Sequence, residues 1–122
     1  MSGINYLADT NAVLYFLSGK ECMKPFVSSR FAVSVINELE LLSFPKITDE
    51  EERQIRGFIE KSVVLDLEDR IKERTIQLRR AYNVKLPDAI VAATAIEHEM
   101  MLITADIGFE RIKELKLKLI IP

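Results

Sequence analysis

The sequence predicts an α/β domain in which a central, mostly parallel sheet of five strands is covered by helices on both faces. Three observations predict it. Short apolar runs alternate with helical patterns along the whole chain, which is typical of a sheet with crossover helices. The 122 residues suit one domain, residues 1–122, and are too few for two. Neither a repeat nor a linker-like stretch interrupts the alternation.

The predicted strands are short runs of apolar and β-branched residues bounded by polar or charged ones. They are residues 4–8, 31–35, 63–67, 101–104 and 117–121.

The predicted helices have start signals or apolar positions at helical spacing. Ser34 is a candidate N-cap, Thr48 and Glu51 have the spacing of a capping box, and Pro87 opens a helix that is apolar on nearly every face. Neighbouring elements should therefore cover that last helix on most sides. The helices are residues 12–17, 34–42, a segment after Thr48 that carries Ile55, Phe58 and Ile59, 68–82, 88–100 and 109–115.

Composition excludes several classes of protein. With 17 basic and 19 acidic residues the net charge is −2, so bulk positive charge is not available for binding nucleic acid. The single cysteine, Cys22, excludes an internal disulfide, and with one histidine, His98, it argues against a zinc site. The N-terminus does not resemble a signal peptide, and the longest near-apolar run, residues 89–96, is too short to span a membrane. We expect a soluble, cytoplasmic protein without membrane association.

Four acidic residues fall near junctions between strands and helices. Asp9 follows the first strand, Asp106 follows the fourth, Asp88 lies in the first turn of the apolar helix, and Glu38 lies in the helix after the second strand. In open α/β sheets, ligands bind beyond the carboxyl ends of the strands. We therefore expect these four carboxylates to share one rim of the sheet.

The choice of Glu38 depends on the phase of its helix. Val35, Leu39 and Leu42 cluster on one side of residues 34–42, which predicts the buried stripe. Glu38 lies roughly 70° from the centre of that stripe and Glu40 roughly 130° away. Glu38 should therefore border the buried face, whereas Glu40 should point to water.

Each acid alone also has a structural interpretation. Asp9 could cap a helix, Asp88 could favour a helix dipole, Glu38 could be solvated, and Asp106 could be a turn residue. Together they indicate a cation site, because unit charges ~4 Å apart repel by ~4 kcal/mol at an effective dielectric constant of ~20. Ligands that are all oxygen suit Mg²⁺ or Mn²⁺ better than zinc.

Four motifs, in this order, resemble those of the PIN-domain nucleases. They are residues 7–11 (LADTN), 34–39 (SVINEL), 86–95 (LPDAIVAATA) and 102–106 (LITAD). More narrowly, they are similar to VapC-type toxins of bacterial and archaeal toxin–antitoxin pairs. The ordered set covers essentially the whole chain and is specific, although no single motif is.

The resemblance implies an endoribonuclease that depends on Mg²⁺ or Mn²⁺ and cuts single-stranded or looped RNA. It also implies a homodimer and an antitoxin peptide that lies across the active-site groove. The implied site residues are the catalytic and metal-holding acids Asp9, Glu38, Asp88 and Asp106, with Asn11 and Thr104 as supporting polar residues.

Substrate phosphates also need cations, and Arg79, Arg80 and Lys85 precede Asp88 in the sequence. They could form a local RNA-binding patch or simply a solvated helix face.

Three alternatives stay open from the sequence. The chain could be a PIN nuclease that processes RNA without an antitoxin, or a binding module that keeps its acids for structure. A phosphoacceptor receiver domain has a similar length and magnesium-binding acids at strand ends. It would need an acidic doublet after the first strand and a lysine at the end of the last, and this chain has neither.

Overall fold

Five parallel strands form one sheet in the computed structural model, which describes residues 4–122. Their order across the sheet is β3-β2-β1-β4-β5, and every neighbouring pair is parallel. The predicted fold class is thus confirmed, with a sheet that is entirely rather than mostly parallel. The strands are β1 (Ile4–Ala8), β2 (Arg30–Ser34), β3 (Val63–Leu65), β4 (Met101–Thr104) and β5 (Leu117–Leu119).

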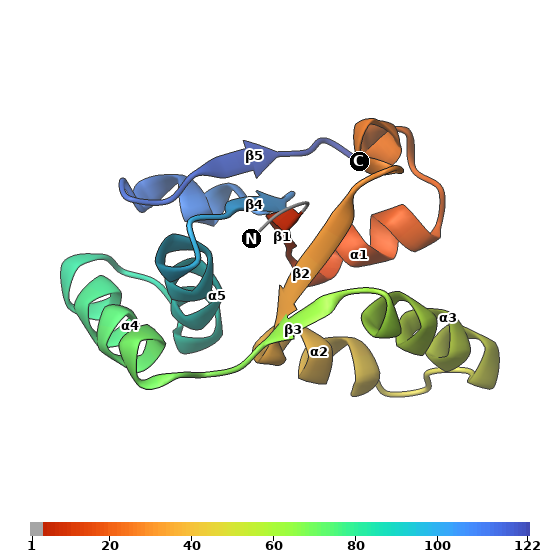
Figure 1. The fold of residues 1–122 in the computed structure, drawn as a ribbon, viewed down its shortest axis with the longest axis horizontal. Helices are drawn as coiled ribbons and strands as arrows, with labels where there is room; N and C mark the ends of the chain where they lie inside the picture. The colour runs from red at the N-terminus through yellow and green to blue at the C-terminus, as the bar shows by residue number, and fades with distance from the viewer. Residues whose placement is uncertain (1–3) are drawn as a thin grey trace.

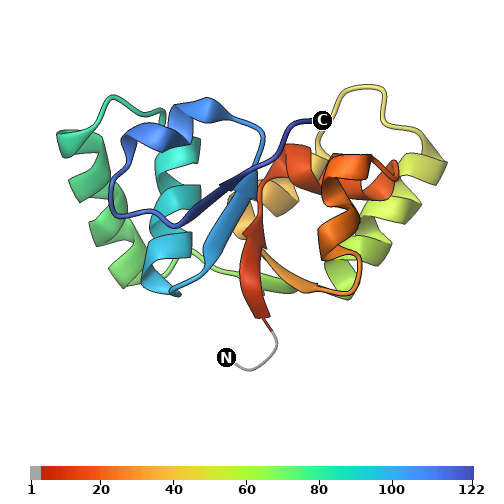
Figure 2. The ribbon, with the colours of Figure 1, turned by 90° about the horizontal axis from the view of Figure 1, so that it is seen from above.

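Helices cover both faces of this sheet (Figures 1 and 2). The pair α4 and α5 packs on one face, while α1 and α3 lie on the other side of the sheet (Figure 2). The helices are α1 (Thr10–Leu17), α2 (Val35–Leu42), α3 (Asp49–Glu60), α4 (Asp69–Ala81) and α5 (Leu86–Glu97), with two 3₁₀ helices, η1 (Glu21–Phe26) and η2 (Ile107–Arg111).

The core is divided in two by the sheet. Leu7 and Leu102 point into the half that α4 and α5 cover, whereas their neighbours Ala8 and Ile103 point into the half that contains residues of α1, α2 and α3. Successive strand residues face opposite sides, so both faces must be apolar when both are covered. Helix α5 is buried over residues 89–95, so it is covered on most sides, as its apolar sequence predicts.

Some element ends differ from those predicted. Helix α5 ends at Glu97, three residues early, because Glu99 takes a left-handed conformation with φ 55°. The amides of Glu99 and Met100 then donate to the carbonyls of Ile96 and Ala95, which is a Schellman ending without the usual glycine. The final helix is the 3₁₀ helix η2 instead of residues 109–115, and η1 was not predicted.

The strand order places a crevice beside β1. The chain builds outward from β1 through β2 to β3 and then crosses to β4 on the other side of β1. Ligands of open α/β sheets bind where the order reverses in this way, here between the carboxyl ends of β1 and β4. The order also shows that the receiver-domain alternative is wrong, because that fold has the order 2-1-3-4-5. In the part of the chain that the structure describes, every helix is too short or too polar to cross a membrane.

Candidate active site

Asp9 is a buried carboxylate at the carboxyl end of β1. It stands at the N-cap position of α1, yet its side chain makes no capping hydrogen bond. Instead, Thr104 Oγ1 donates to Asp9 Oδ2 at 2.7 Å, and Asn37 Nδ2 donates to Asp9 Oδ1 at 3.2 Å. Burial raises the pKa of Asp9 even though these hydrogen bonds favour its ionised form. The carboxylate is therefore held by side chains of α2 and β4 and does not cap α1.

Thr104 and Asn11 join the ends of β4 and α1. Thr104 Oγ1 accepts from the amide of Asp106 at 3.1 Å and from Asn11 Nδ2 at 3.4 Å. The side-chain oxygen of Asn11 accepts from the amide of Ala105 at 3.1 Å. Both residues that the sequence suggested as supporting ones therefore lie in the hydrogen-bond network around Asp9.

Asn37 is a further member of this network that the sequence analysis did not single out. Its side chain is fully buried, and it closes a capping box with Ser34 at the start of α2. Besides Asp9, its amide donates to Thr10 Oγ1 at 3.1 Å, and Thr10 Oγ1 donates to Glu40 Oε1 at 2.7 Å. One buried amide thus links the carboxylate of β1 to a carboxylate on α2.

The acid that α2 brings to the site is Glu40, not Glu38. The predicted stripe of α2 is wrong, because Leu39 is 59% exposed while Asn37 and Leu41 are fully buried. The inward turn of Asn37 toward Asp9 sets the phase of the helix. On either side of that buried stripe, Glu40 and Glu38 then lie on opposite flanks.

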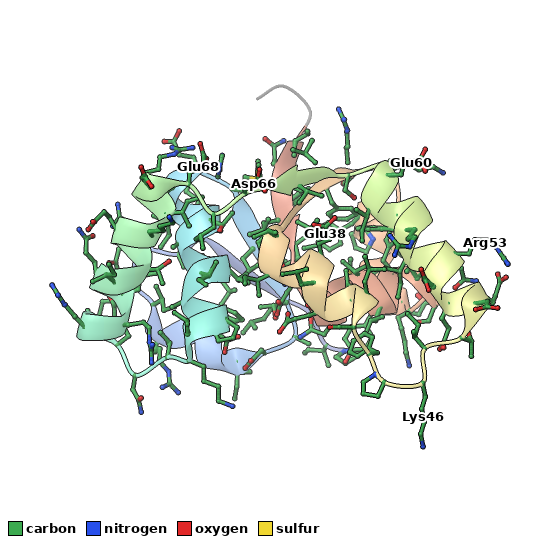
Figure 3. All side chains as sticks on the ribbon, turned by 90° about the horizontal axis from the view of Figure 1, so that it is seen from below. Glu38, Lys46, Arg53, Glu60, Asp66 and Glu68 are labelled. Carbon is green, nitrogen blue, oxygen red and sulfur yellow. The ribbon has the colours of Figure 1, made fainter. Side chains whose placement is uncertain are left out.

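The two glutamates consequently have different surroundings. Glu40 is close enough for its charge to raise the pKa of both Asp9 and Asp88. Glu38 is half-buried on α2 (Figure 3), and its charge is not among those that raise the pKa of Asp9 or Asp88. The signal that could have identified Glu40 is Asn37, a polar residue one helical turn before the buried Leu41. If Asn37 is taken as part of the buried stripe, Glu40 lies on one flank of that stripe and Glu38 on the other.

Asp88 and Asp106 complete the group of acids, which we call the carboxylate site: Asp9, Glu40, Asp88 and Asp106. Asp88 is half-buried in the first turn of α5. Burial raises its pKa most, the negative charges of Asp106, Asp9 and Glu40 raise it further, and the charge of Lys85 opposes them. Asp106 is exposed and accepts from the amide of Gly108 at 2.8 Å as the N-cap of η2.

The carboxylate site has the donor chemistry of a magnesium site but is not a closed cage. Among residues 4–122, no three His, Cys, Asp or Glu side chains lie close enough together to hold a metal ion directly. Mg²⁺ keeps several of its waters and binds proteins through one or two carboxylates, so this open arrangement suits it. The mutual repulsion that raises the pKa of Asp88 is also what a cation would relieve.

A cleft of about 450 Å³ opens beside Asp88 and Asp106, and three of its other lining residues are basic. We call it the basic cleft. Of the three basic residues that the sequence suggested, Arg79 and Lys85 line it and Arg80 does not; Arg111 lines it as well and was not predicted. The full lining is Arg79, Asn83, Val84, Lys85, Asp88, Asp106, Gly108, Phe109 and Arg111.

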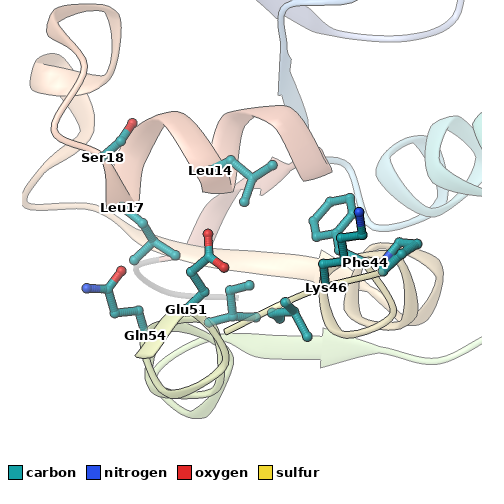
Figure 4. Close-up of a pocket in the computed structure, with 10 residues that line it drawn as sticks. Leu14, Leu17, Ser18, Phe44, Lys46, Glu51 and Gln54 are labelled. Carbon is teal, nitrogen blue, oxygen red and sulfur yellow. The ribbon is translucent and has the colours of Figure 1, made fainter. Parts of the chain in front are cut away.

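A second cavity of about 480 Å³ lies away from the carboxylate site, between α1, the α2–α3 loop and α3 (Figure 4). Its walls are mainly apolar, with Leu14, Leu17 and Phe44 among them. Its only acid among the lining residues, Glu51, accepts from the amide of Thr48 in the capping box of α3. The carboxylate of Glu51 is therefore engaged in a structural contact at the start of α3.

The comparisons with known proteins agree with this geometry. Residues 6–115 match the family model of the PIN domain. A comparison with curated protein sequences gave no match. Among solved structures, the chain is similar to a toxin–antitoxin complex from Klebsiella pneumoniae, with 31% identity and a TM-score of 0.77, over 90% of this chain and 94% of that chain.

Two further structures share the fold at lower identity. VapBC2 from Rickettsia felis, bound to a DNA fragment from its promoter, is 21% identical with a TM-score of 0.81, over 97% of this chain and 99% of that one. VapBC-1 from nontypeable Haemophilus influenzae is 22% identical with a TM-score of 0.81, over 95% and 97%. Since the family model spans most of the sequence and the fold agrees, this chain belongs to the PIN domain family.

Proposed function

We propose that this PIN domain is a divalent-metal-dependent endoribonuclease and the toxin of a toxin–antitoxin pair. The observation that carries the nuclease proposal is the carboxylate site itself. Four acids from four different elements surround the switch point of the sheet, and burial together with mutual repulsion raises the pKa of Asp88. A structural role for these acids would not need them to face one another.

The proposed role of each acid follows from its position in the site. Asp9 and Asp88 are the proposed direct ligands of Mg²⁺ or Mn²⁺, because one is fixed by two hydrogen bonds and the other faces the remaining acids. Glu40 and Asp106 are proposed to hold waters of the ion or a second ion. When bound, such an ion supplies activation of water and neutralisation of charge on the phosphate.

The surrounding residues position these ligands. Thr104 and Asn37 each donate to a different oxygen of Asp9, so the carboxylate cannot rotate freely. Thr10 donates to Glu40 and holds that side chain toward the site. We propose no histidine base, since the one histidine, His98, lies beside Arg70 and Glu68 at the C-terminus of α5.

Cleavage of a mixed pool of structured RNA by purified protein tests the reaction. Mg²⁺ or Mn²⁺ is compared with EDTA, and a DNA pool of matched lengths is compared with the RNA. Asp88→Asn should lose cleavage, whereas Glu38→Gln, a change of the same kind outside the site, should retain it. A wild-type protein that binds RNA but cleaves no pool with any metal would instead favour the binding-module alternative.

The toxin proposal is supported by the nature of the similar structures, which are toxin–antitoxin complexes. A homodimer is consistent with exposed leucines on two elements that contact each other, Leu39 on α2 and Leu86 on α5. Expression in the cytoplasm of a bacterial host should arrest growth, and Asp88→Asn should not. A neighbouring gene for a small DNA-binding protein that restores growth would identify the antitoxin, and its absence would favour RNA processing.

A further inference from the structure

The basic cleft contains three basic side chains that form no close ion pair within the described residues, although Asp88 and Asp106 line the same cleft. Most arginines on α3 and α4 pair with a carboxylate, as Arg53 does with Glu50 and Arg74 with Glu97. By contrast, within residues 4–122, the charged groups of Arg79, Lys85 and Arg111 form no ion pair closer than 4 Å. Free cations that converge on one cleft favour an anionic ligand.

The backbone around the cleft holds these cations in place. Arg111 Nη1 donates to the carbonyl of Asn83, which ties η2 to the connector between α4 and α5. On the other side of that connection, Tyr82 Oη donates to Glu114. These two hydrogen bonds fix the connector against the C-terminal part of the chain. The connector and the C-terminal part therefore both contribute side chains to the cleft.

The cleft is also oriented relative to the carboxylate site. Asp88 and Asp106 belong to its lining, so the basic side chains of the cleft are neighbours of the carboxylate site. Lys85 is the N-cap residue of α5 and has no capping side chain, so the positive end of the helix dipole opens at the same place. Because Asp88 and Asp106 line the same cleft as the cations, a strand with one phosphate at the carboxylates would have a neighbouring phosphate beside those cations.

We propose that the basic cleft is a phosphate subsite, in which Arg79, Lys85 and Arg111 bind a phosphate of the RNA strand adjacent to the one that is cleaved. The inference rests on the proposed nuclease function for its substrate class. It assigns substrate binding to Arg111 and separates Arg79 from its neighbour Arg80, which has the same charge but lies outside the cleft.

Binding of a fluorescein-labelled single-stranded RNA of mixed sequence tests the subsite without any need for cleavage. All proteins carry Asp88→Asn and are measured in EDTA, so the RNA stays intact whether or not the wild type is a nuclease. Arg79→Ala, Lys85→Ala and Arg111→Ala are compared with Arg80→Ala, the matched control, over a range of salt concentrations.

Each of the three cleft variants should reduce the slope of log K against log salt, and by no more than about 0.7, the value for one phosphate contact with a single strand, because the three cations share one phosphate. At 0.1 M salt this upper limit corresponds to a loss of affinity of about fivefold, since 10 to the power 0.7 is about 5. Arg80→Ala should change affinity by less than about twofold. Arg79→Ala and Lys85→Ala remove no hydrogen bond that holds the fold, so they test the subsite even where Arg111→Ala loosens the connector.

Equal losses for Arg79→Ala and Arg80→Ala would overturn the proposal, because they would indicate diffuse attraction instead of a site. An unchanged salt slope in all three cleft variants would overturn it as well. The outcome is independent of the nuclease assay. If the cleft variants lose RNA binding selectively and the wild type never cleaves RNA, the subsite is supported and the nuclease proposal is rejected. If the wild type cleaves RNA and the cleft variants bind RNA normally, only the subsite is rejected.

Discussion

Replacing Asp88 with asparagine should stabilise the metal-free protein while abolishing cleavage. The carboxylate of Asp88 is half-buried and faces three other acids, with only Lys85 to oppose them. Its position in the first turn of α5 stabilises the helix by about 0.3–1 kcal/mol through the dipole. The raised pKa of Asp88 indicates that burial and repulsion outweigh this gain. Asp88→Asn keeps the size of the side chain and removes the charge.

The size of the expected gain in the free energy of unfolding follows from the partial exposure of the site. Unit charges about 8 Å apart repel by about 1 kcal/mol at an effective dielectric constant of about 40, which is intermediate between protein and water. A net gain of about 1 kcal/mol would raise the Tm by roughly 3–6 °C for a domain of this size. In wild type, Mg²⁺ at ten times its Kd would add about 1.4 kcal/mol, because it binds only the folded state.

Thermal unfolding followed by circular dichroism, with and without Mg²⁺, measures both effects. In EDTA the Tm of Asp88→Asn should exceed that of wild type, and Mg²⁺ should raise the Tm of wild type much more than that of the variant. A lower Tm for Asp88→Asn in EDTA would refute the argument, since Asp88 would then be a stabilising helix-start residue. An equal response of both proteins to Mg²⁺ would show that Asp88 is not a ligand.

The same comparison has a definite dependence on pH. Below the ordinary aspartate pKa of 3.8 the side chain is protonated in both the folded and unfolded states, so its ionisation costs the fold nothing. Between that value and the raised folded-state pKa, the native protein binds more protons than the unfolded chain, and stability contributed by Asp88 falls as pH rises. The excess Tm of Asp88→Asn should therefore be small at pH 3 and reach its full size near neutral pH; a constant excess would contradict this origin.

Three further substitutions separate the roles of other residues in the site. Glu40→Gln should reduce metal-dependent cleavage about 10- to 100-fold, as loss of an outer ligand does, whereas Glu38→Gln should change it by less than about twofold. A larger loss for Glu38→Gln in steady-state assays would show that Glu38, and not Glu40, belongs to the site. Asp9→Asn should lower the Tm, unlike Asp88→Asn, because an amide in place of Oδ1 or Oδ2 faces a hydrogen-bond donor at a cost of about 1–3 kcal/mol. Gly108→Ala should reduce kcat at an unchanged Tm, because its Cβ would lie 3.0 Å from Oδ1 of Asp106; unchanged kinetics would show that Asp106 needs no fixed orientation.

The fold class and three of the four acids were predictable because they depend on local pattern. Alternating apolar runs and helices require a covered parallel sheet, and the ends of its strands are defined by where those runs end. Asp9, Asp88 and Asp106 stand directly at such ends or at a helix start, so a shift of one residue in an element would not move them from the rim.

Glu40 and Arg111 were missed because their positions depend on tertiary contacts. The phase of α2 is decided by Asn37, a polar residue that is buried only because Asp9, Thr10 and Ser34 provide partners for its amide. A pattern of apolar residues assigns such a residue to the surface. It therefore does not show that Glu40, which is exposed as predicted, lies on the flank that faces Asp9 and Asp88. Arg111 reaches the cleft because η2 folds back against the connector after α4, a contact that no local spacing indicates.

The network around Asp9 explains why two acids of one site should respond oppositely to the same substitution. The amide of Asn37 uses its hydrogens on Asp9 and Thr10, so the hydroxyl hydrogen of Thr10 is left for Glu40. Thr104 accepts from the amide of Asp106, and its own hydrogen goes to Asp9.

The side chains of Asn37 and Thr104 therefore donate to the carboxylate of Asp9 and favour its ionised form, while burial of Asp9 opposes ionisation. Asp88 has the repulsion without these donors. The protein thus holds one carboxylate in place by hydrogen bonds and leaves the other with uncompensated repulsion, which a divalent cation at the proposed site would relieve.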